Sequence, residues 1–145
     1  MSSQFIEQTA REALSQAVWD GRRRRIARWL TRKSNRLLSF GEIYATLQGK
    51  GRRYVGVRTI PLNNIVGSVG RSQEFDCTFA PRRTVESERW VRVAKAYYEN
   101  VELPPVELYK VGELYFVADG NHRISVASAC GQRYVDAYVT EIDAA

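Results

Sequence analysis

The first part of the chain has apolar residues at the spacing of an amphipathic helix. Between residues 3 and 19 they recur every three or four positions, as Phe5, Ile6, Ala10, Ala13, Leu14, Ala17 and Val18. This spacing predicts one helix over residues 3–19. Asp20-Gly21 predicts a break after it.

A second amphipathic helix is expected within residues 21–40, because at helical spacing its basic and its apolar residues fall on two neighbouring faces. One arc is basic and consists of Arg25, Arg28, Arg32 and Arg36. The neighbouring arc is apolar and consists of Ile26, Trp29, Leu30 and Leu37. Ser39 to Glu42 then has the form of a capping box, which predicts a short helix to about Leu47.

The pattern changes near Tyr54, where β-branched and aromatic residues replace the helical spacing. Residues 54–62 therefore predict a strand, and the globular unit is expected to begin here. Residues 63–79 mix glycine and polar turns with isolated apolar positions, which predicts an ordered loop. We expect two regions, a basic helical extension over residues 1–52 and a domain over residues 53–145.

The rest of the chain predicts a helix, a hairpin, a helix and a strand. The helix over residues 84–100 stops before Pro104-Pro105. VELYK and LYFVA read as a hairpin, residues 121–130 as a helix closed by Gly131, and YVDAYVTEI as the last strand. The inward stripe of the first of these helices is predicted to be Trp90, Val93, Ala94, Tyr97 and Val101.

Composition narrows the class of protein. At 145 residues and 44% hydrophobic content, the chain has the size of one domain with a real core. Cys77 and Cys130 have neither a metal-binding spacing nor a disulfide framework, and the N-terminus lacks the apolar run of a signal peptide. No stretch approaches the roughly 20 apolar residues that cross a bilayer. A soluble, cytoplasmic protein is expected.

The net charge of +6 is unevenly distributed. Residues 1–60 hold 13 Lys and Arg against 4 Asp and Glu, which is a net +9, so the remainder is net −3. Such asymmetry indicates an anionic partner: nucleic acid, an acidic protein or a membrane surface. The candidate phosphate contacts are Arg22, Arg23, Arg24, Arg25, Arg28, Arg32, Lys33 and Arg36. The alternative is a solvated basic face whose apolar side packs on the globule or on a second chain.

The most informative short motif is Asp119-Gly120-Asn121-His122-Arg123, where a predicted strand enters a predicted helix. The first amides of a helix have no intrahelical partner, and the helix dipole adds positive potential there. Arg123 adds a planar donor fork that suits phosphate, and His122 adds a hydrogen bond or a proton. The plainer interpretation is an ordinary N-cap with a solvated first turn.

Residues 60–142 resemble the N-terminal domain of the ParB family, which belongs to a superfamily with sulfiredoxin and a free-serine kinase. The family pattern has a turn that leads to "PR…FD", and this sequence has Gly70-Arg71 followed by Phe75-Asp76. The block LPPVELYKVGELYFVADGNHRISVASACGQRYVDAYV has the family's order of hairpin, turn, small-residue helix and strand. The resemblance implies an α+β fold, a ParB/sulfiredoxin-like small mixed sheet with packed helices, here preceded by a basic helical segment.

The resemblance also implies roles for residues. The superfamily holds nucleotide phosphates at this loop, which carries over to Gly120, Asn121, His122 and Arg123, with Arg71 opposite as a second contact. Glu74 and Asp76, with Asp119, are the carboxylates expected to hold Mg²⁺ or to act as a base, because hard metals prefer oxygen ligands. Asp76 as the cap of the next turn is the alternative.

Departures from the family pattern limit what is carried over. ParB has Gly-Glu-Arg-Arg at the start of the helix, and only the last arginine is present here. Asn121 stands where sulfiredoxin has its nucleophilic cysteine, so that redox chemistry is not expected. The ParB helix-turn-helix domain has no counterpart within the 145 residues, so sequence-specific operator reading is not expected either.

Three functional hypotheses follow. The leading one is a ParB-like module that binds a nucleotide, such as a nucleoside triphosphate with Mg²⁺, or a nucleic-acid phosphate at Asp119–Arg123, with the arginine-rich segment assisting on DNA. The second is an enzyme of the same fold, a metal-dependent nuclease or a nucleotide-dependent phosphotransferase, with Asp119 and His122 as catalytic residues. The third is an interaction protein whose N-terminal helices form homo-oligomers.

Overall fold

The structure, a computed structural model, describes residues 3–31, 34–36, 38–39, 41, 51–70 and 73–142. Within these residues the helices are α1 (Ser3–Leu30), α3 (Ser87–Tyr98) and α4 (Asn121–Ala129). The strands are β1 (Leu38–Ser39), β2 (Arg52–Pro61), β3 (Ile65–Ser68), β4 (Val106–Val111), β5 (Leu114–Asp119) and β6 (Tyr134–Ile142). A short 3₁₀ turn, Leu62–Asn64, links β2 to β3.

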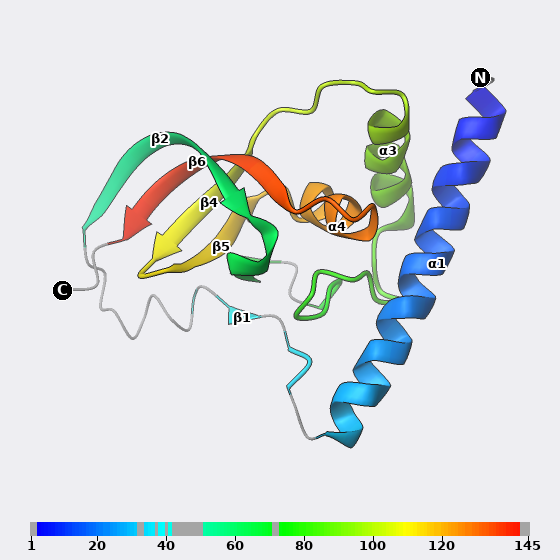
Figure 1. The fold of residues 1–145 in the computed structure, drawn as a ribbon, viewed down its shortest axis with the longest axis horizontal. Coiled ribbons are helices and arrows are strands. Elements are labelled where there is room, and N and C mark those ends of the chain that lie inside the picture. The colour runs from blue at the N-terminus through cyan, green and yellow to red at the C-terminus, as the bar shows by residue number, and fades with distance from the viewer. Residues whose placement is uncertain are drawn as a thin grey trace.

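The strands form one mixed sheet in the order β1-β3-β5-β4-β6-β2. β4 lies between β5, to which it is antiparallel, and β6, to which it is parallel. The helices gather at one end of the sheet, with α4 next to the strands, α3 beside it and α1 along the outside (Figure 1). The predicted α+β class with a mixed sheet, packed helices and a helical N-terminal segment is confirmed.

Most predicted elements are confirmed, but the separate helix expected within residues 21–40 is wrong, because its first part belongs to α1, which ends at Leu30. The strand near residue 54, the hairpin, the two helices that correspond to α3 and α4 and the last strand are all present. The predicted loop over residues 63–79 is wrong in part, because it contains β3. This strand has only four residues and pairs in parallel with β5, about fifty residues away in sequence, so no local alternation marks it. Most of the predicted helix after Ser39 lies outside the described residues.

The main core lies between the sheet and the helices. Its largest completely buried side chains come from α3, the loop before α3, β4 and α4, namely Trp90, Phe75, Leu108 and Ile124. The indole N–H of Trp90 donates to the hydroxyl of Ser125 at 2.9 Å, which satisfies the polar atom of this buried ring. Val101, predicted to face inward, is exposed because it lies beyond the end of α3.

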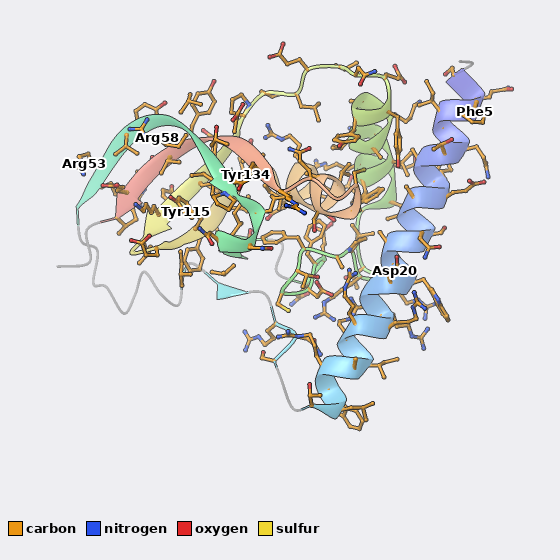
Figure 2. The ribbon with its side chains drawn as sticks, viewed as in Figure 1. Phe5, Asp20, Arg53, Arg58, Tyr115 and Tyr134 are labelled. Carbon is orange, nitrogen blue, oxygen red and sulfur yellow. The ribbon has the colours of Figure 1, made fainter. Side chains whose placement is uncertain are left out.

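β2 forms one border of the sheet and is irregular. Its pairing with β6 shifts register between Tyr54 and Gly56, where Gly56 has a φ of +91°. Arg53 and Arg58 lie along this strand (Figure 2), and Arg53 donates to Glu141 of β6 at 2.6 Å. The border of the sheet is therefore both charged and bent.

The break predicted at Asp20-Gly21 is wrong, because α1 runs continuously through both residues. Gly21 is buried, and a Cβ placed on it would lie 2.8 Å from the Cβ of Ala80. The absence of a side chain at Gly21 therefore allows α1 to pack closely against the loop before α3, and the residue does not form a turn. None of the helices in the described ranges has the length and apolar character that crossing a bilayer requires.

We predict that Gly21→Ala destabilises the protein, although the same change in an open helix stabilises by about 1 kcal/mol. The added methyl group must displace Ala80, so the expected loss is about 1–3 kcal/mol in free energy of unfolding. Urea unfolding measures it. Adding Ala80→Gly to the variant should restore most of the loss, and a Gly21→Ala protein more stable than the wild type would contradict the close packing.

Candidate functional site

The turn between β5 and α4 is built around Gly120. This residue has φ 112° and ψ 25°, in the left-handed region that favours glycine. A Cβ on it would lie 2.6 Å from Cγ1 of Val106, so the position also has no room for a side chain. Ile124 donates to the carbonyl of Gly120 at 2.9 Å, which starts the helix. The amides of residues 121–123 therefore have no intrahelical acceptor.

These residues line an open cavity of about 550 Å³. Its walls are Val69 and Gly70 after β3, Arg89 and Val93 of α3, and residues 118–123. The cavity therefore brings together the start of α4 and two guanidinium groups, those of Arg89 and Arg123. Arg71, the predicted second phosphate contact, lies outside the described residues.

Arg123 is held by its neighbours. Its guanidinium donates to the carbonyl of Pro104 at 2.7 Å, to that of Pro105 at 3.1 Å and to the carboxylate of Asp119 at 3.1 Å. It thus fastens the segment before β4 to the first turn of α4. A phosphate in the cavity would compete with Asp119, whose side chain is largely exposed, for this guanidinium.

His122 is buried and lies next to Glu74. Its Nε2 is 3.5 Å from Oε1 of Glu74, and its ring meets that of Phe75 edge-on with centroids 5.2 Å apart. Glu74 also accepts a hydrogen bond of 3.0 Å from the amide of Glu86, where α3 begins. The structure therefore pairs predicted residues as His122 with Glu74 and Arg123 with Asp119.

Asn121 is also buried, at 9% exposure. Its Oδ1 has no hydrogen-bond partner within the part of the chain that the structure describes. A buried acceptor without a donor costs about 1–3 kcal/mol. The structure therefore leaves a buried amide oxygen without a donor beside the cavity, among the described residues.

Asp76 stabilises the loop before α3 and is not among the residues that line the cavity at the start of α4. One carboxylate oxygen accepts from the amide of Thr78, the hydroxyl of Thr78 and the amide of Ala80, at 2.7–3.0 Å. The other accepts from Arg25 of α1 at 3.0 Å. Across the described residues no group of three or more His, Cys, Asp or Glu is placed to hold a metal ion.

The basic residues of the N-terminal segment divide into two sets. Arg25 is mostly buried on Asp76, and Arg28 donates to the backbone of Ser34 and to the side chain of Asn35 at 3.0 Å. Exposed members are Arg22, Arg23, Arg24 and Arg36. Arg32 and Lys33 lie outside the described residues. The basic arc of the sequence thus faces the protein at Arg25 and Arg28.

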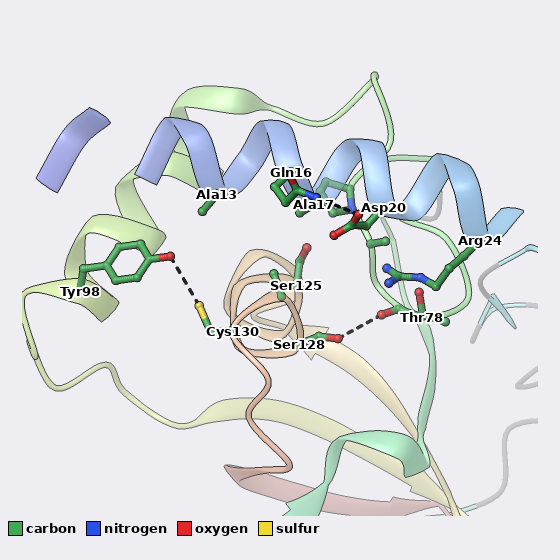
Figure 3. A pocket seen from close by; sticks show the side chains of 13 residues that line it. Ala13, Gln16, Ala17, Asp20, Arg24, Thr78, Tyr98, Ser125, Ser128 and Cys130 are labelled. Carbon is green, nitrogen blue, oxygen red and sulfur yellow. Dashed lines mark hydrogen bonds between the residues drawn. The ribbon is translucent and has the colours of Figure 1, made fainter. Parts of the chain in front are cut away.

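A second cavity, of about 460 Å³, lies between α1 and α4 (Figure 3). The guanidinium of Arg24 turns into it above Thr78, and the thiol of Cys130 lies 4.0 Å from the hydroxyl of Tyr98. Burial raises the pKa of both Cys130 and Tyr98. Neither side chain therefore supplies a negative charge to this cavity near neutral pH.

Arg89 is the cavity residue that sequence reasoning missed. It lies four positions before Val93 on α3, so both residues project toward α4. Val93 belongs to the predicted inward stripe, and this spacing is the signal that could have placed Arg89 beside it. Its Nε lies 3.7 Å from a carboxylate oxygen of Glu86, and its side chain is 44% exposed.

We predict that Asp76→Ala lowers the free energy of unfolding by about 3–5 kcal/mol, because it leaves the Arg25 guanidinium buried without its carboxylate. The matched control is Arg23→Ala, which removes an exposed ion pair with Asp20 on the same helix. That change should cost less than about 1 kcal/mol. Equal effects of the two substitutions in urea unfolding would show that the Arg25–Asp76 pair does not hold α1.

No family model matches the chain, and no curated protein matches it. Among solved structures, sulfiredoxin from Arabidopsis thaliana is similar, with a TM-score of 0.44 and 14% sequence identity. The match covers 57% of this chain and 82% of that chain.

Proposed function

We propose that this protein binds the phosphate groups of a nucleotide, or of nucleic acid, at the start of α4. The observation that carries the proposal is the Gly120 turn, which presents the amides of residues 121–123 at a cavity bordered by Arg89 and Arg123. A helix start is suited to anions, because free amides and the helix dipole both favour negative charge. Two guanidinium groups within the same cavity add charge-assisted hydrogen bonds.

Asp119 is a negative charge at the proposed phosphate site. Its carboxylate lies at the cavity and pairs with Arg123, so it opposes a second anion. A bound Mg²⁺ would relieve this repulsion, since carboxylates and phosphate oxygens are its preferred ligands. We therefore expect a nucleoside triphosphate with Mg²⁺ to bind better than the nucleotide alone. We also propose a cytoplasmic location, where such nucleotides are found.

An enzyme of the same fold is the second candidate, and the proximity of His122 to Glu74 favours it. A carboxylate beside a histidine can orient the ring and stabilise its protonated form. In a metal-dependent nuclease or a phosphotransferase, Asp119 and His122 would act on the bound phosphate, with Glu74 or Asp76 as the further carboxylate. Asp76 is the weaker choice, because its oxygens are already bonded to Thr78, Ala80 and Arg25.

Calorimetric titration with pyrophosphate, ATP and CTP, each with and without Mg²⁺, tests the proposal. Thermal unfolding is the second measurement. Binding should raise the melting temperature, because a ligand at 100 times its dissociation constant adds about 2.7 kcal/mol to the free energy of unfolding. Arg89→Gln should weaken binding by about tenfold, corresponding to the loss of about one charge-assisted bond. Arg92→Gln, an exposed arginine on the same helix that does not line the cavity, is the matched control.

Asp119→Asn separates the two candidates. For a binding module without Mg²⁺, removing this carboxylate should strengthen pyrophosphate binding, because the repulsion is removed and Arg123 is released. For the enzyme, the same substitution should abolish product formation from a nucleotide or DNA substrate while binding persists. Absence of binding by every anion tested, in a folded protein, would reject both.

A further prediction concerns the exposed arginines Arg22, Arg23 and Arg24, which we propose assist binding to nucleic acid. Changing all three to Ala should lower affinity for duplex DNA. The slope of log affinity against log salt should also fall by about 1 for each phosphate that the protein no longer neutralises. The slope is measured by fluorescence anisotropy over a salt series. An unchanged slope would show that these residues do not meet the DNA backbone.

A further inference from the structure

The outer face of α1 carries an apolar stripe that nothing in the described structure covers. Trp19, Ile26, Trp29 and Leu30 are 55%, 53%, 72% and 69% exposed. Large apolar side chains exposed to this extent over three consecutive turns of one helix are unusual on a soluble surface and mark a contact site.

Helix geometry places this stripe opposite the packed face. At about 100° per residue, Trp19, Ile26 and Leu30 fall within an arc of about 40°, and Trp29 lies about 60° beyond the edge of that arc. The buried residues of α1, which are Ala10, Ala17 and Gly21, fall on the other side of the helix. The stripe therefore points away from α3, and the end of α1 that carries it projects beyond the rest of the molecule (Figure 1).

Positive charge borders the stripe. Arg22 and Arg23 lie between Trp19 and Ile26 along the helix and within about 60° of the stripe's centre. Arg23 donates to Asp20 at 2.8 Å, and Arg22 is exposed. Along α1, the outer face is therefore apolar at Trp19 and again from Ile26 to Leu30, with Arg22 and Arg23 between these two parts.

The geometry points to an anionic lipid bilayer as the occupant of this face. Two indoles and two aliphatic side chains would enter the boundary between headgroups and acyl chains, as in helices that lie on membranes. Indoles prefer this boundary because they are apolar rings with one polar N–H. The guanidinium groups of Arg22 and Arg23 would remain at the level of the lipid phosphates while their methylene stems cover apolar surface.

Other occupants fit the same face less well. A partner helix would bury Arg22 and Arg23 in the middle of its interface, where desolvation opposes the ion pairs they form. A second copy of the chain would bring its own arginines against these two. Duplex DNA offers phosphates, but it offers no apolar environment for Ile26 and Leu30. Only the bilayer provides phosphates and an apolar layer at adjacent depths.

The test uses the full chain with vesicles of phosphatidylcholine alone and of equal parts phosphatidylcholine and phosphatidylglycerol. The protein should sediment with the mixed vesicles and not with the neutral ones, and its tryptophan emission should shift to the blue. Changing Trp29 and Leu30 together to Ser should weaken this binding by at least about tenfold. Changing Arg22 and Arg23 to Gln should weaken it by about fivefold for each residue.

Val101→Ser is the matched control, because Val101 is 52% exposed but lies on the segment after α3. It should leave vesicle binding unchanged, and all variants should keep the wild-type melting temperature because the altered side chains are exposed. Pyrophosphate binding should also persist in the Trp29 and Leu30 variant, which separates this inference from the proposed phosphate site. Duplex DNA should compete with the mixed vesicles, since both would use Arg22 and Arg23.

Several results would overturn the inference. Failure to bind the mixed vesicles would do so directly. Binding that is equal in the wild type and in the Trp29 and Leu30 variant would show attraction by charge alone. Loss of self-association in that variant, with vesicle binding unchanged, would assign the stripe to a second copy of the chain. Loss of DNA binding, again with vesicle binding unchanged, would assign it to nucleic acid.

Discussion

The carboxylate of Asp76 is the interaction on which the arrangement of the helices depends. It accepts three hydrogen bonds within its own loop and a fourth from Arg25, so one buried side chain orders the loop and attaches α1 to it. The loop leads directly to α3, and α3 supplies Arg89 to the cavity at α4. The N-terminal helix is consequently joined to the region that forms the candidate site. The boundary expected near residue 52 stays a prediction.

The same attachment reverses the expected orientation of the basic helix. An amphipathic helix normally turns its apolar side to the protein, because burial of apolar surface is favourable. In α1 the inner face has small residues together with Arg25 and Arg28, each of which has its acceptors inside the molecule. Trp19, Ile26 and Leu30 are left on the solvent side. The sequence placed Arg25 and Arg28 on one arc and Ile26, Trp29 and Leu30 on the next, and the structure has these residues on one helix. It wrongly extended that helix toward residue 40, because α1 ends at Leu30, and it could not show which arc met the rest of the chain.

The sequence was most informative where local signals agreed with tertiary structure. The hairpin of β4 and β5, the glycine-closed α4 and β6 follow from alternation, turns and caps that act over a few residues. β3 could not be recognised, because its stability comes from parallel pairing with the distant β5. Gly21 looked like a helix break, and only the position of Ala80 shows that it is a contact. At the candidate site, the motif was enough to single out residues 119–123. The place of Arg89 in the cavity became visible only from the packing of α3 against α4.

The irregular border strand also bears on how the protein behaves at high concentration. A long strand at the side of a sheet offers unpaired amides and carbonyls to any other extended chain, which is a route to lateral aggregation. In β2 the register shift at Gly56 interrupts that ladder, and Arg53 and Arg58 place like charges against a second copy. A bulge and two charged side chains are the features by which exposed sheet borders oppose lateral pairing, and β2 has both.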